Sequence, residues 1–215
     1  MLTYLTIIAP YICRMDMYKK FTALVLAAFW FCHPALAEKA SLDVLSGYLN
    51  DLKTVESEFV QQSSDGSVQT GTLFIQRPGK MRFEYAPPQR ALVLASNNAV
   101  AIFDGRSNGN PETYPLRRTP LSVLLAKNVN LSSADMVVGH SFDGVHTVVT
   151  AQDPKTPESG QIQLKFSDDP VALKEWVIVD EYGTQTTVRL KAVQTGMSFP
   201  RSLFDIDSER RRRGQ

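Results

Sequence analysis

The stretch Gly71-Thr72-Leu73-Phe74-Ile75-Gln76-Arg77-Pro78-Gly79-Lys80-Met81-Arg82-Phe83-Glu84-Tyr85 decides the fold of this chain. Its alternation of apolar and polar residues predicts two β-strands, and Pro78-Gly79 predicts a tight turn between them. Side chains two residues apart share one face of a strand, so Arg77 lies on the same face as Leu73 and Ile75. If that face is an interior, the guanidinium needs hydrogen-bond partners there.

Runs of alternating residues recur along the rest of the chain and predict further strands. The predicted strands span residues 55–63, 68–77, 80–86, 90–95, 99–103, 136–142, 145–152, 161–167, 172–180 and 184–194. Turn dipeptides such as Asp65-Gly66, Asn97-Asn98 and Asp143-Gly144 separate consecutive runs. Short connections of this kind join antiparallel neighbours, so the sequence predicts a long antiparallel meander.

Two segments have the pattern of helices. The leucines at positions 42, 45, 49 and 52 recur at helical spacing after Ser41 and predict a helix over 41–53. Thr119-Pro120 offers a capping hydroxyl and a proline at the first helical position, so we expect a central helix over 119–127. The meander must bury one face, and these helices are its visible cover. We therefore expect a mainly β fold with α elements, an unclosed and strongly curved antiparallel β-barrel covered by lid helices and enclosing an apolar cavity.

Residues 1–37 have the three parts of a secretory signal peptide. Lys19-Lys20 precede an apolar run from Phe21 to Cys32, and Ala35-Leu36-Ala37 forms a small-residue cleavage site. The apolar run has about a dozen residues, whereas a helix needs roughly 20 to cross a bilayer. We expect cleavage after Ala37, and translation that starts at Met15 or Met17.

Cleavage would leave residues 38–215 as a single domain of about 178 residues. Both cysteines, Cys13 and Cys32, would be removed, which excludes a disulfide framework and thiolate metal sites. Of 23 basic and 22 acidic residues, three basic and one acidic lie before Glu38, so 20 and 21 remain. A net charge of −1 argues against nucleic-acid binding. We interpret 208–215, with the run Arg210–Arg213, as a disordered basic tail without a role.

The sequence offers weak candidates for catalysis. Gly105-Arg106-Ser107-Asn108-Gly109 fits the nucleophile motif G-x-S-x-G, but that motif requires a helix directly after the serine. Asn110 and Pro111 follow instead, which favours a hairpin tip. His140 and His146 flank one turn without a third ligand, and we interpret them as surface residues. We expect neither enzymatic activity nor a cofactor or metal.

Several ordered motifs together resemble a known family. They are Gly71-x-Leu73-x-x-x-Arg77-Pro78-Gly79, Met81 to Tyr85 with Pro87 or Pro88, Thr119-Pro120-Leu121 with Leu124-Leu125, Leu173 to Trp176, Asp180 to Gly183, Thr187 to Leu190 and Leu203-Phe204. In this order they resemble the periplasmic outer-membrane lipoprotein carriers (LolA-like), over most of residues 41–206. The resemblance implies the same unclosed, lidded barrel.

The resemblance also implies a function. Members of the family are periplasmic chaperones that take acylated lipoproteins from an inner-membrane ABC-type releasing complex, shelter the acyl chains in an apolar cavity, and deliver them to an outer-membrane receptor. We expect this chain to do so as a monomer. Two alternatives stay open: a periplasmic sensor or adaptor that binds a protein partner, and a carrier of another lipid with the same fold.

The resemblance assigns roles to individual residues. The family's arginine, implicated in closing the lid, falls on Arg77, which we expect to act as a lid latch. Met81 stands where other members carry an aromatic ring. The expected acyl-chain cavity is lined by Leu73, Ile75, Met81, Phe83, Tyr85, Leu92, Leu94, Leu121, Leu124 and Leu125, with Val93 in place of its neighbours if the strand has the other register. Core packing for the apolar residues, and an Arg77 that extends to water, are the competing interpretations.

Overall fold

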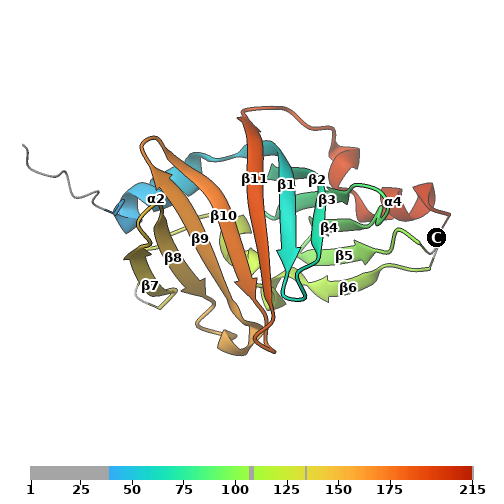
Figure 1. Ribbon diagram of the computed structural model, residues 1–215. Coiled ribbons are helices and arrows are strands. Elements are labelled where there is room, and N and C mark those ends of the chain that lie inside the picture. The colour runs from blue at the N-terminus through green and yellow to red at the C-terminus, as the bar shows by residue number, and fades with distance from the viewer. Residues whose placement is uncertain (1–38, 107–108, 134, 215) are drawn as a thin grey trace, which may run out of the picture. The chain divides into compact units, whose positions relative to one another are not determined.

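The computed structural model describes residues 39–214 except 107, 108 and 134, and the described part is dominated by one curved antiparallel sheet (Figure 1). The strands are β1 (Thr54–Ser63), β2 (Val68–Gln76), β3 (Lys80–Tyr85), β4 (Leu92–Ser96), β5 (Ala99–Phe103), β6 (Glu112–Pro115), β7 (Val137–Phe142), β8 (Thr147–Gln152), β9 (Gln161–Asp168), β10 (Val171–Val179) and β11 (Gln185–Thr195). Their order is β6-β5-β4-β3-β2-β1-β11-β10-β9-β8-β7. The two ends of the sheet, β6 and β7, do not pair, so the barrel is unclosed.

The sequence therefore predicted the fold class correctly. The ten predicted strands are all present with boundaries shifted by one or two residues, and the hairpin at Pro78-Gly79 joins β2 to β3. Strand β6 was missed. Its four residues are all exposed, so it lacks the alternation of buried and exposed side chains on which the prediction depended.

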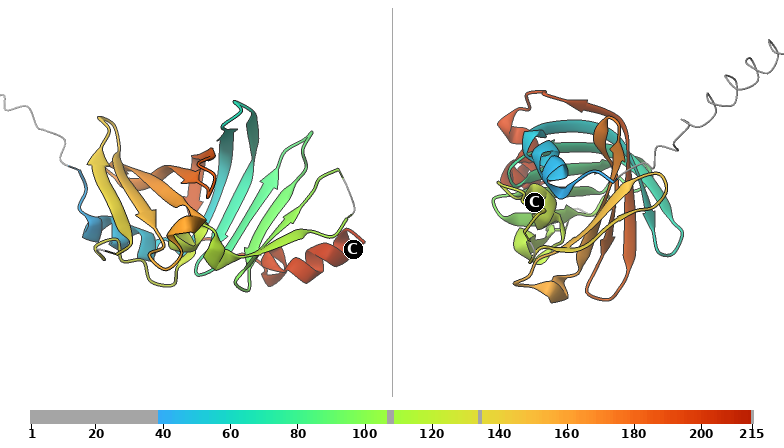
Figure 2. Two further views of the ribbon diagram at one scale, coloured as in Figure 1. Left: turned by 90° about the horizontal axis from the view of Figure 1, so that it is seen from below. Right: turned by 90° about the vertical axis from the view of Figure 1, so that its left-hand side faces the viewer.

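The helical elements are α2 (Leu42–Asp51), η1 (Leu116–Arg118), α3 (Leu121–Leu125), η2 (Pro157–Ser159), η3 (Arg201–Phe204) and α4 (Ile206–Arg212). Helix α2 begins at the Ser41 cap, whose hydroxyl accepts a hydrogen bond from the Val44 amide, and it buries Leu45 and Leu49 completely. Figure 2 shows α2 and the η1–α3 segment on one face of the curved sheet and α4 on the other face of β3–β5. Both predicted helices exist, although the central one is shorter than expected.

A second, smaller core lies on the face of the sheet that carries α4. Its buried residues are Leu92, Leu94, Ala101, Phe103 and Phe204, with Phe74, Phe199, Leu203 and Ile206 packed against them. The rings of Phe74 and Phe204 lie edge-on to Phe199, with centroids 5.7 and 5.9 Å from its own. The chain thus covers both faces of the β3–β5 region.

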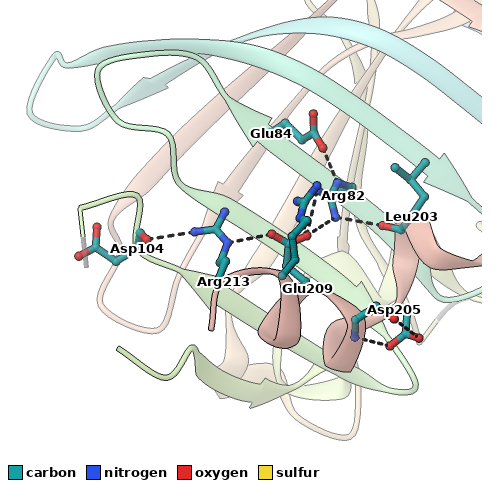
Figure 3. Close-up of polar contacts among 9 residues, drawn as sticks. Arg82, Glu84, Asp104, Leu203, Asp205, Glu209 and Arg213 are labelled. Atoms are coloured by element: carbon teal, nitrogen blue, oxygen red, sulfur yellow. Dashed lines mark hydrogen bonds and ion pairs between the residues drawn. The ribbon is translucent and has the colours of Figure 1, made fainter. Parts of the chain in front are cut away.

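The expectation of a disordered tail from residue 208 is wrong, because residues 206–212 form α4. Its anchor is Glu209, which lies beside Arg82 of β3, and both side chains are only 4% exposed (Figure 3). The Glu209 carboxylate also pairs with Arg212 and accepts a hydrogen bond from Arg213 Nε at 2.8 Å. Arg213 Nη1 reaches the Asp104 carbonyl at 3.2 Å. In the sequence the four consecutive arginines indicate a solvated run, but Arg212 and Arg213 neutralise the buried carboxylate of Glu209.

Arg82 is satisfied on three sides. Its Nε donates to Glu84 Oε1 at 2.6 Å, its Nη1 donates to the Leu203 carbonyl at 3.1 Å, and both terminal nitrogens face Glu209 Oε2 at 3.4 Å. A buried cation is tolerated when its charge and its donors are matched in this way. Burial alone would raise the pKa of Glu209, but hydrogen bonds from Arg212 and Arg213 and the charge of Arg82 together hold that pKa below its usual range.

We predict that Glu209→Gln lowers the free energy of unfolding by about 1–3 kcal/mol at neutral pH, because Arg82 loses its buried counter-charge. The control is Asp207→Asn, which removes an exposed carboxylate from the same helix. A lowered folded-state pKa stabilises the protein above the ordinary glutamate pKa, and this contribution is lost as the pH falls through the folded value. Urea unfolding should therefore show the difference between wild type and Glu209→Gln shrinking below about pH 4. A difference that is constant in acid contradicts the assignment.

Candidate functional site

The face of the β2–β3 hairpin that lies under α2 and residues 116–131, which include η1 and α3, is apolar and buried. These two covering parts of the chain are called the lid. Leu73 and Ile75 on β2 pair with Phe83 and Met81 on β3, and all four side chains are at most 5% exposed. They belong to one cluster with the lid leucines Leu121, Leu124 and Leu125. Seven of the residues predicted to line a cavity thus lie in one cluster, four on the hairpin and three on α3.

Aromatic rings extend this apolar face toward β1 and β10. The Phe59 ring meets Phe83 and Tyr85 edge-on, with centroids 5.1 and 5.2 Å apart, and Trp176 lies edge-on to Phe83 at 6.3 Å. Gly71 is needed here, because a Cβ at this position would come within 2.8 Å of the Phe59 ring and 2.0 Å of the Glu84 carbonyl oxygen. Tyr85 packs against the same cluster.

The hydroxyl of Tyr85 is the polar end of this aromatic group. It donates a hydrogen bond to Gln61 Oε1 at 2.7 Å. Burial raises the pKa of Tyr85 to about 12, in spite of the hydrogen bond to Gln61. The phenol is therefore neutral at physiological pH and suits an apolar surface.

Arg77 is buried on this apolar face, as the alternation of β2 predicted. It is 8% exposed, and its Nη2 donates to the carbonyl of Ala126, the C-terminal cap of α3, at 2.6 Å. Nε and Nη1 are buried without a hydrogen-bond partner. Burial lowers the pKa of the guanidinium, which nevertheless stays charged because arginine is not deprotonated in proteins. A single carbonyl is thus the hydrogen-bond partner of a buried cation.

Two backbone hydrogen bonds fasten the η1–α3 segment to the sheet, one at each of its ends. The Gly79 amide donates to the Leu125 carbonyl at 3.0 Å, beside the Arg77 contact. At the other end of the segment, the Leu116 amide donates to the Asn98 carbonyl at 2.8 Å. The η1–α3 segment is therefore held to the sheet at two turns, β2–β3 and β4–β5.

Helix α2 is fastened to the chain that follows α3. The side-chain amide of Asn50 makes two hydrogen bonds with the backbone of Val129, donating to its carbonyl at 2.8 Å and accepting from its amide at 2.9 Å. One turn earlier, Ser46 Oγ accepts from the Leu131 amide at 2.9 Å. These bonds join the two parts of the lid, α2 and residues 116–131, into one layer.

Two predicted cavity residues lie elsewhere. Leu92 and Leu94 pair with Glu84 and Arg82, so they lie on the α4 side of the sheet and belong to the second core. The reason is register, which a sequence alone does not fix: in β4 it is Val93 that packs against the cluster under the lid. The assignment of Leu92 and Leu94 to the face under the lid is wrong, and Val93 lies on that face instead.

Two pockets open beside the η1–α3 segment, and they differ in character. One has a volume of about 520 Å³ and a mainly apolar lining with four charged residues, Arg118, Glu158, Asp180 and Glu181; its apolar side chains include Val93, Val100, Ile102, Tyr114, Leu121 and Ile178. Of these, Val100 and Leu121 are buried members of the cluster under the lid. The other has a volume of about 740 Å³ and lies between the lid and the turns β2–β3 and β4–β5. Both pockets reach the cluster under the lid, the first through Val100 and Leu121 and the second through Leu116 and Leu125.

The weak catalytic and metal candidates gain no support. His140 Nε2 lies 3.0 Å from the Ala40 carbonyl and His146 lies 3.8 Å from Asp143, so each contacts a different group. Within residues 39–214, as far as they are described, no three His, Cys, Asp or Glu side chains form a metal-binding group. Ser107, the predicted signal peptide and both cysteines lie outside the described residues.

Sequence reasoning missed three parts of the site. Ala126 contributes its backbone carbonyl, and because every residue has one, the residue type cannot reveal this contact. Ser46 and Asn50 are spaced i, i+4 beside the leucine stripe of α2, and this spacing was the available signal. Arg82 sits in the hairpin that decides the fold, and its place on the face opposite Met81 and Phe83 was readable from alternation alone.

The sequence model of the family described as "Outer membrane lipoprotein carrier protein LolA" matches residues 50–207. The chain belongs to this family. Named relatives include the outer-membrane lipoprotein carrier proteins of Dechloromonas aromatica, 27% identical over 89% of this chain and 93% of the relative, and of Cupriavidus pinatubonensis, 23% identical over 85% and 91%. The family is one of carriers, so the resemblance noted in the sequence is confirmed.

A solved structure supports the fold independently of sequence. The putative outer membrane lipoprotein-sorting protein domain from Vibrio parahaemolyticus is 6% identical, covers 79% of this chain and 97% of its own, and has a TM-score of 0.50. In the described part of the chain, no helix is long and apolar enough to span a membrane.

We predict that Asn50→Ala lowers the free energy of unfolding by about 1–3 kcal/mol, because the buried amide and carbonyl of Val129 lose their partners. Asp51→Ala, at the exposed neighbouring position of α2, is the control and should change stability by less than about 0.5 kcal/mol. Urea denaturation measures both. Equal effects of the two substitutions would show that the Asn50 contact does not hold the lid.

Proposed function

We propose that this protein is a periplasmic chaperone for acylated lipoproteins. It would receive them from an inner-membrane ABC-type releasing complex and pass them to an outer-membrane receptor. Membership of the carrier family supports lipoprotein cargo. The observation that carries the proposal is the apolar face of β2–β3 under a lid that is fastened to the sheet by the contacts at Arg77, Gly79 and Leu116. Nothing in this arrangement calls for chemistry on the cargo.

The free-energy cost of exposing an acyl chain to water determines how much apolar surface a carrier must provide. Burial of each CH₂ group is worth about 0.8 kcal/mol, so a chain of about 15 such groups costs about 12 kcal/mol when exposed. A carrier must offer a comparable apolar surface without exposing it when empty. In the closed structure Leu121, Leu124 and Leu125 occupy the face that acyl chains would take.

The apolar pocket marks where cargo would enter. Ile102 and Tyr114, on β5 and β6, are partly exposed at its mouth, while Val100 and Leu121 connect it with the cluster under the lid. An acyl chain placed there would remain in contact with apolar side chains as it displaces α3. During lid opening, contacts between α3 and the sheet are then replaced by contacts between the acyl chain and the sheet, which keeps the free-energy cost of opening low.

The test of this function is binding of acylated ligand. A triacylated synthetic lipopeptide should displace a fluorescent fatty-acid probe from the purified protein, and mass spectrometry of extracted ligand should find acylated lipoprotein after expression in the periplasm. Failure of both assays contradicts a carrier function. Extraction of a different lipid alone would favour the carrier of another lipid, and extraction of none with a stable protein partner would favour the adaptor.

We predict that Arg77→Leu loads lipopeptide as wild type does but releases it more slowly. The guanidinium bond to Ala126 fastens the closed lid, and on the proposed mechanism its loss shifts the balance toward the open, loaded state. A charged hydrogen bond is worth about 1.5–3 kcal/mol, which corresponds to release at least about ten-fold slower. Transfer of labelled lipopeptide to detergent micelles measures the rate, with Lys174→Leu, an exposed cation on β10, as the control. Release at the wild-type rate contradicts the latch.

A further inference from the structure

The larger of the two pockets beside the lid carries positive charge. It is lined by Pro78, Gly79, Lys80, Asn97, Asn98, Leu116, Arg117, Ser122, Leu125, Ala126 and Lys127, and it measures about 740 Å³. Three of these side chains are cations and none is a carboxylate. The apolar pocket on the other side of α3 has the opposite balance, with Glu158, Asp180 and Glu181 against a single Arg118. The lid segment separates two pockets of opposite sign.

The three cations are not engaged elsewhere. Lys80 is half-buried, and Arg117 and Lys127 are exposed. None of their side chains makes a hydrogen bond or ion pair with any residue in the described part of the chain, whereas Arg82, Arg189, Arg212 and Arg213 are all paired with carboxylates. Three unpaired cations around one concave surface create a field that attracts anionic groups.

The pocket is also where the lid is fastened. Leu125 and Ala126 contribute both lining and the carbonyls that accept from Gly79 and Arg77, and Leu116 with Asn98 forms the third fastening contact. A group that fills this pocket therefore touches both partners of the Gly79–Leu125 and Leu116–Asn98 contacts, and it touches Ala126, whose carbonyl accepts from Arg77. Arg77, the residue before Pro78 in the chain, keeps two buried N–H groups unpaired.

We propose that this pocket is the docking site for an acidic, extended segment of a protein partner. Carboxylates on that segment would pair with Lys80, Arg117 and Lys127, and the amides of Asn97 and Asn98 would meet its backbone. The site lies between the β2–β3 turn, the β4–β5 turn and the η1–α3 segment. Its volume lies within the range that accepts a compact ligand or a few residues of a peptide.

Docking at this place has a consequence for the lid. A carboxylate is a stronger acceptor for a guanidinium than a backbone carbonyl is, so an acidic side chain near Arg77 competes with Ala126 for it. A docked partner thereby weakens the closed state on the side away from the acyl entrance. This consequence rests on the proposed carrier function, whereas the docking site itself does not.

The test uses a fluorescein-labelled hexa-aspartate peptide, followed by fluorescence anisotropy on the purified full chain. The site variant is Lys80→Glu with Arg117→Glu and Lys127→Glu. The matched control is Arg106→Glu with Lys155→Glu and Lys174→Glu, which reverses three exposed cations elsewhere and gives the same change in net charge. Hexa-asparagine is the neutral peptide control.

We expect the wild type and the control variant to bind hexa-aspartate in a salt-sensitive manner, and the site variant to bind it at least about ten-fold more weakly. Equal loss in both triple variants, no binding by the wild type, or equal binding of hexa-asparagine overturns the proposal. Site-dependent binding of inorganic phosphate or phosphatidylglycerol vesicles with none of the peptide also overturns it. Uptake of the fatty-acid probe is measured in parallel. If the site variant still binds the probe, a negative peptide result contradicts the docking site but not the carrier function.

Discussion

The β2–β3 hairpin carries two buried guanidinium groups on opposite faces. Each requires hydrogen-bond acceptors, and the elements packed on that face of the hairpin supply them. Arg82 on the outer face has carboxylates from Glu84 and Glu209 and a carbonyl from Leu203. Arg77 on the inner face has the Ala126 carbonyl and two unpaired N–H groups. The desolvation cost of a buried charge is offset by the counter-charges and hydrogen bonds that it gains. The outer contact is therefore a fixed anchor, and the inner one is poorly satisfied and easily exchanged.

This asymmetry gives each face of the hairpin a separate role. On the outer face, η3 and α4 close a small core of their own and hold β3–β5 in place. On the inner face, the lid covers an apolar surface with side chains that acyl groups could replace at little cost. The buried residues on the two faces form separate clusters. The lid on the inner face can therefore move while η3 and α4 stay packed on the outer face and the sheet stays intact.

The sequence predicted the fold and the inner site to different depths. Alternation identified ten strands and placed Arg77, Leu73 and Ile75 on one face, because a period of two is a local property. Leu92 and Leu94 were misplaced because the register of β4 depends on its pairing with β3, which is not local. The arginine run was misread for a similar reason: whether Arg212 and Arg213 are solvated depends on a carboxylate that is buried only once α4 docks on the sheet.

Amide hydrogen exchange at individual residues tests the central claim most directly. The amides of Gly79 and Leu116 donate across the junction between lid and sheet, and the amide of Phe83 lies inside the β2–β3–β4 part of the sheet. If the lid opens over cargo, saturating triacylated lipopeptide should accelerate exchange at Gly79 and Leu116 and leave Phe83 protected. Unchanged or slower exchange at both junction amides in the loaded protein would contradict a carrier that works by lid opening.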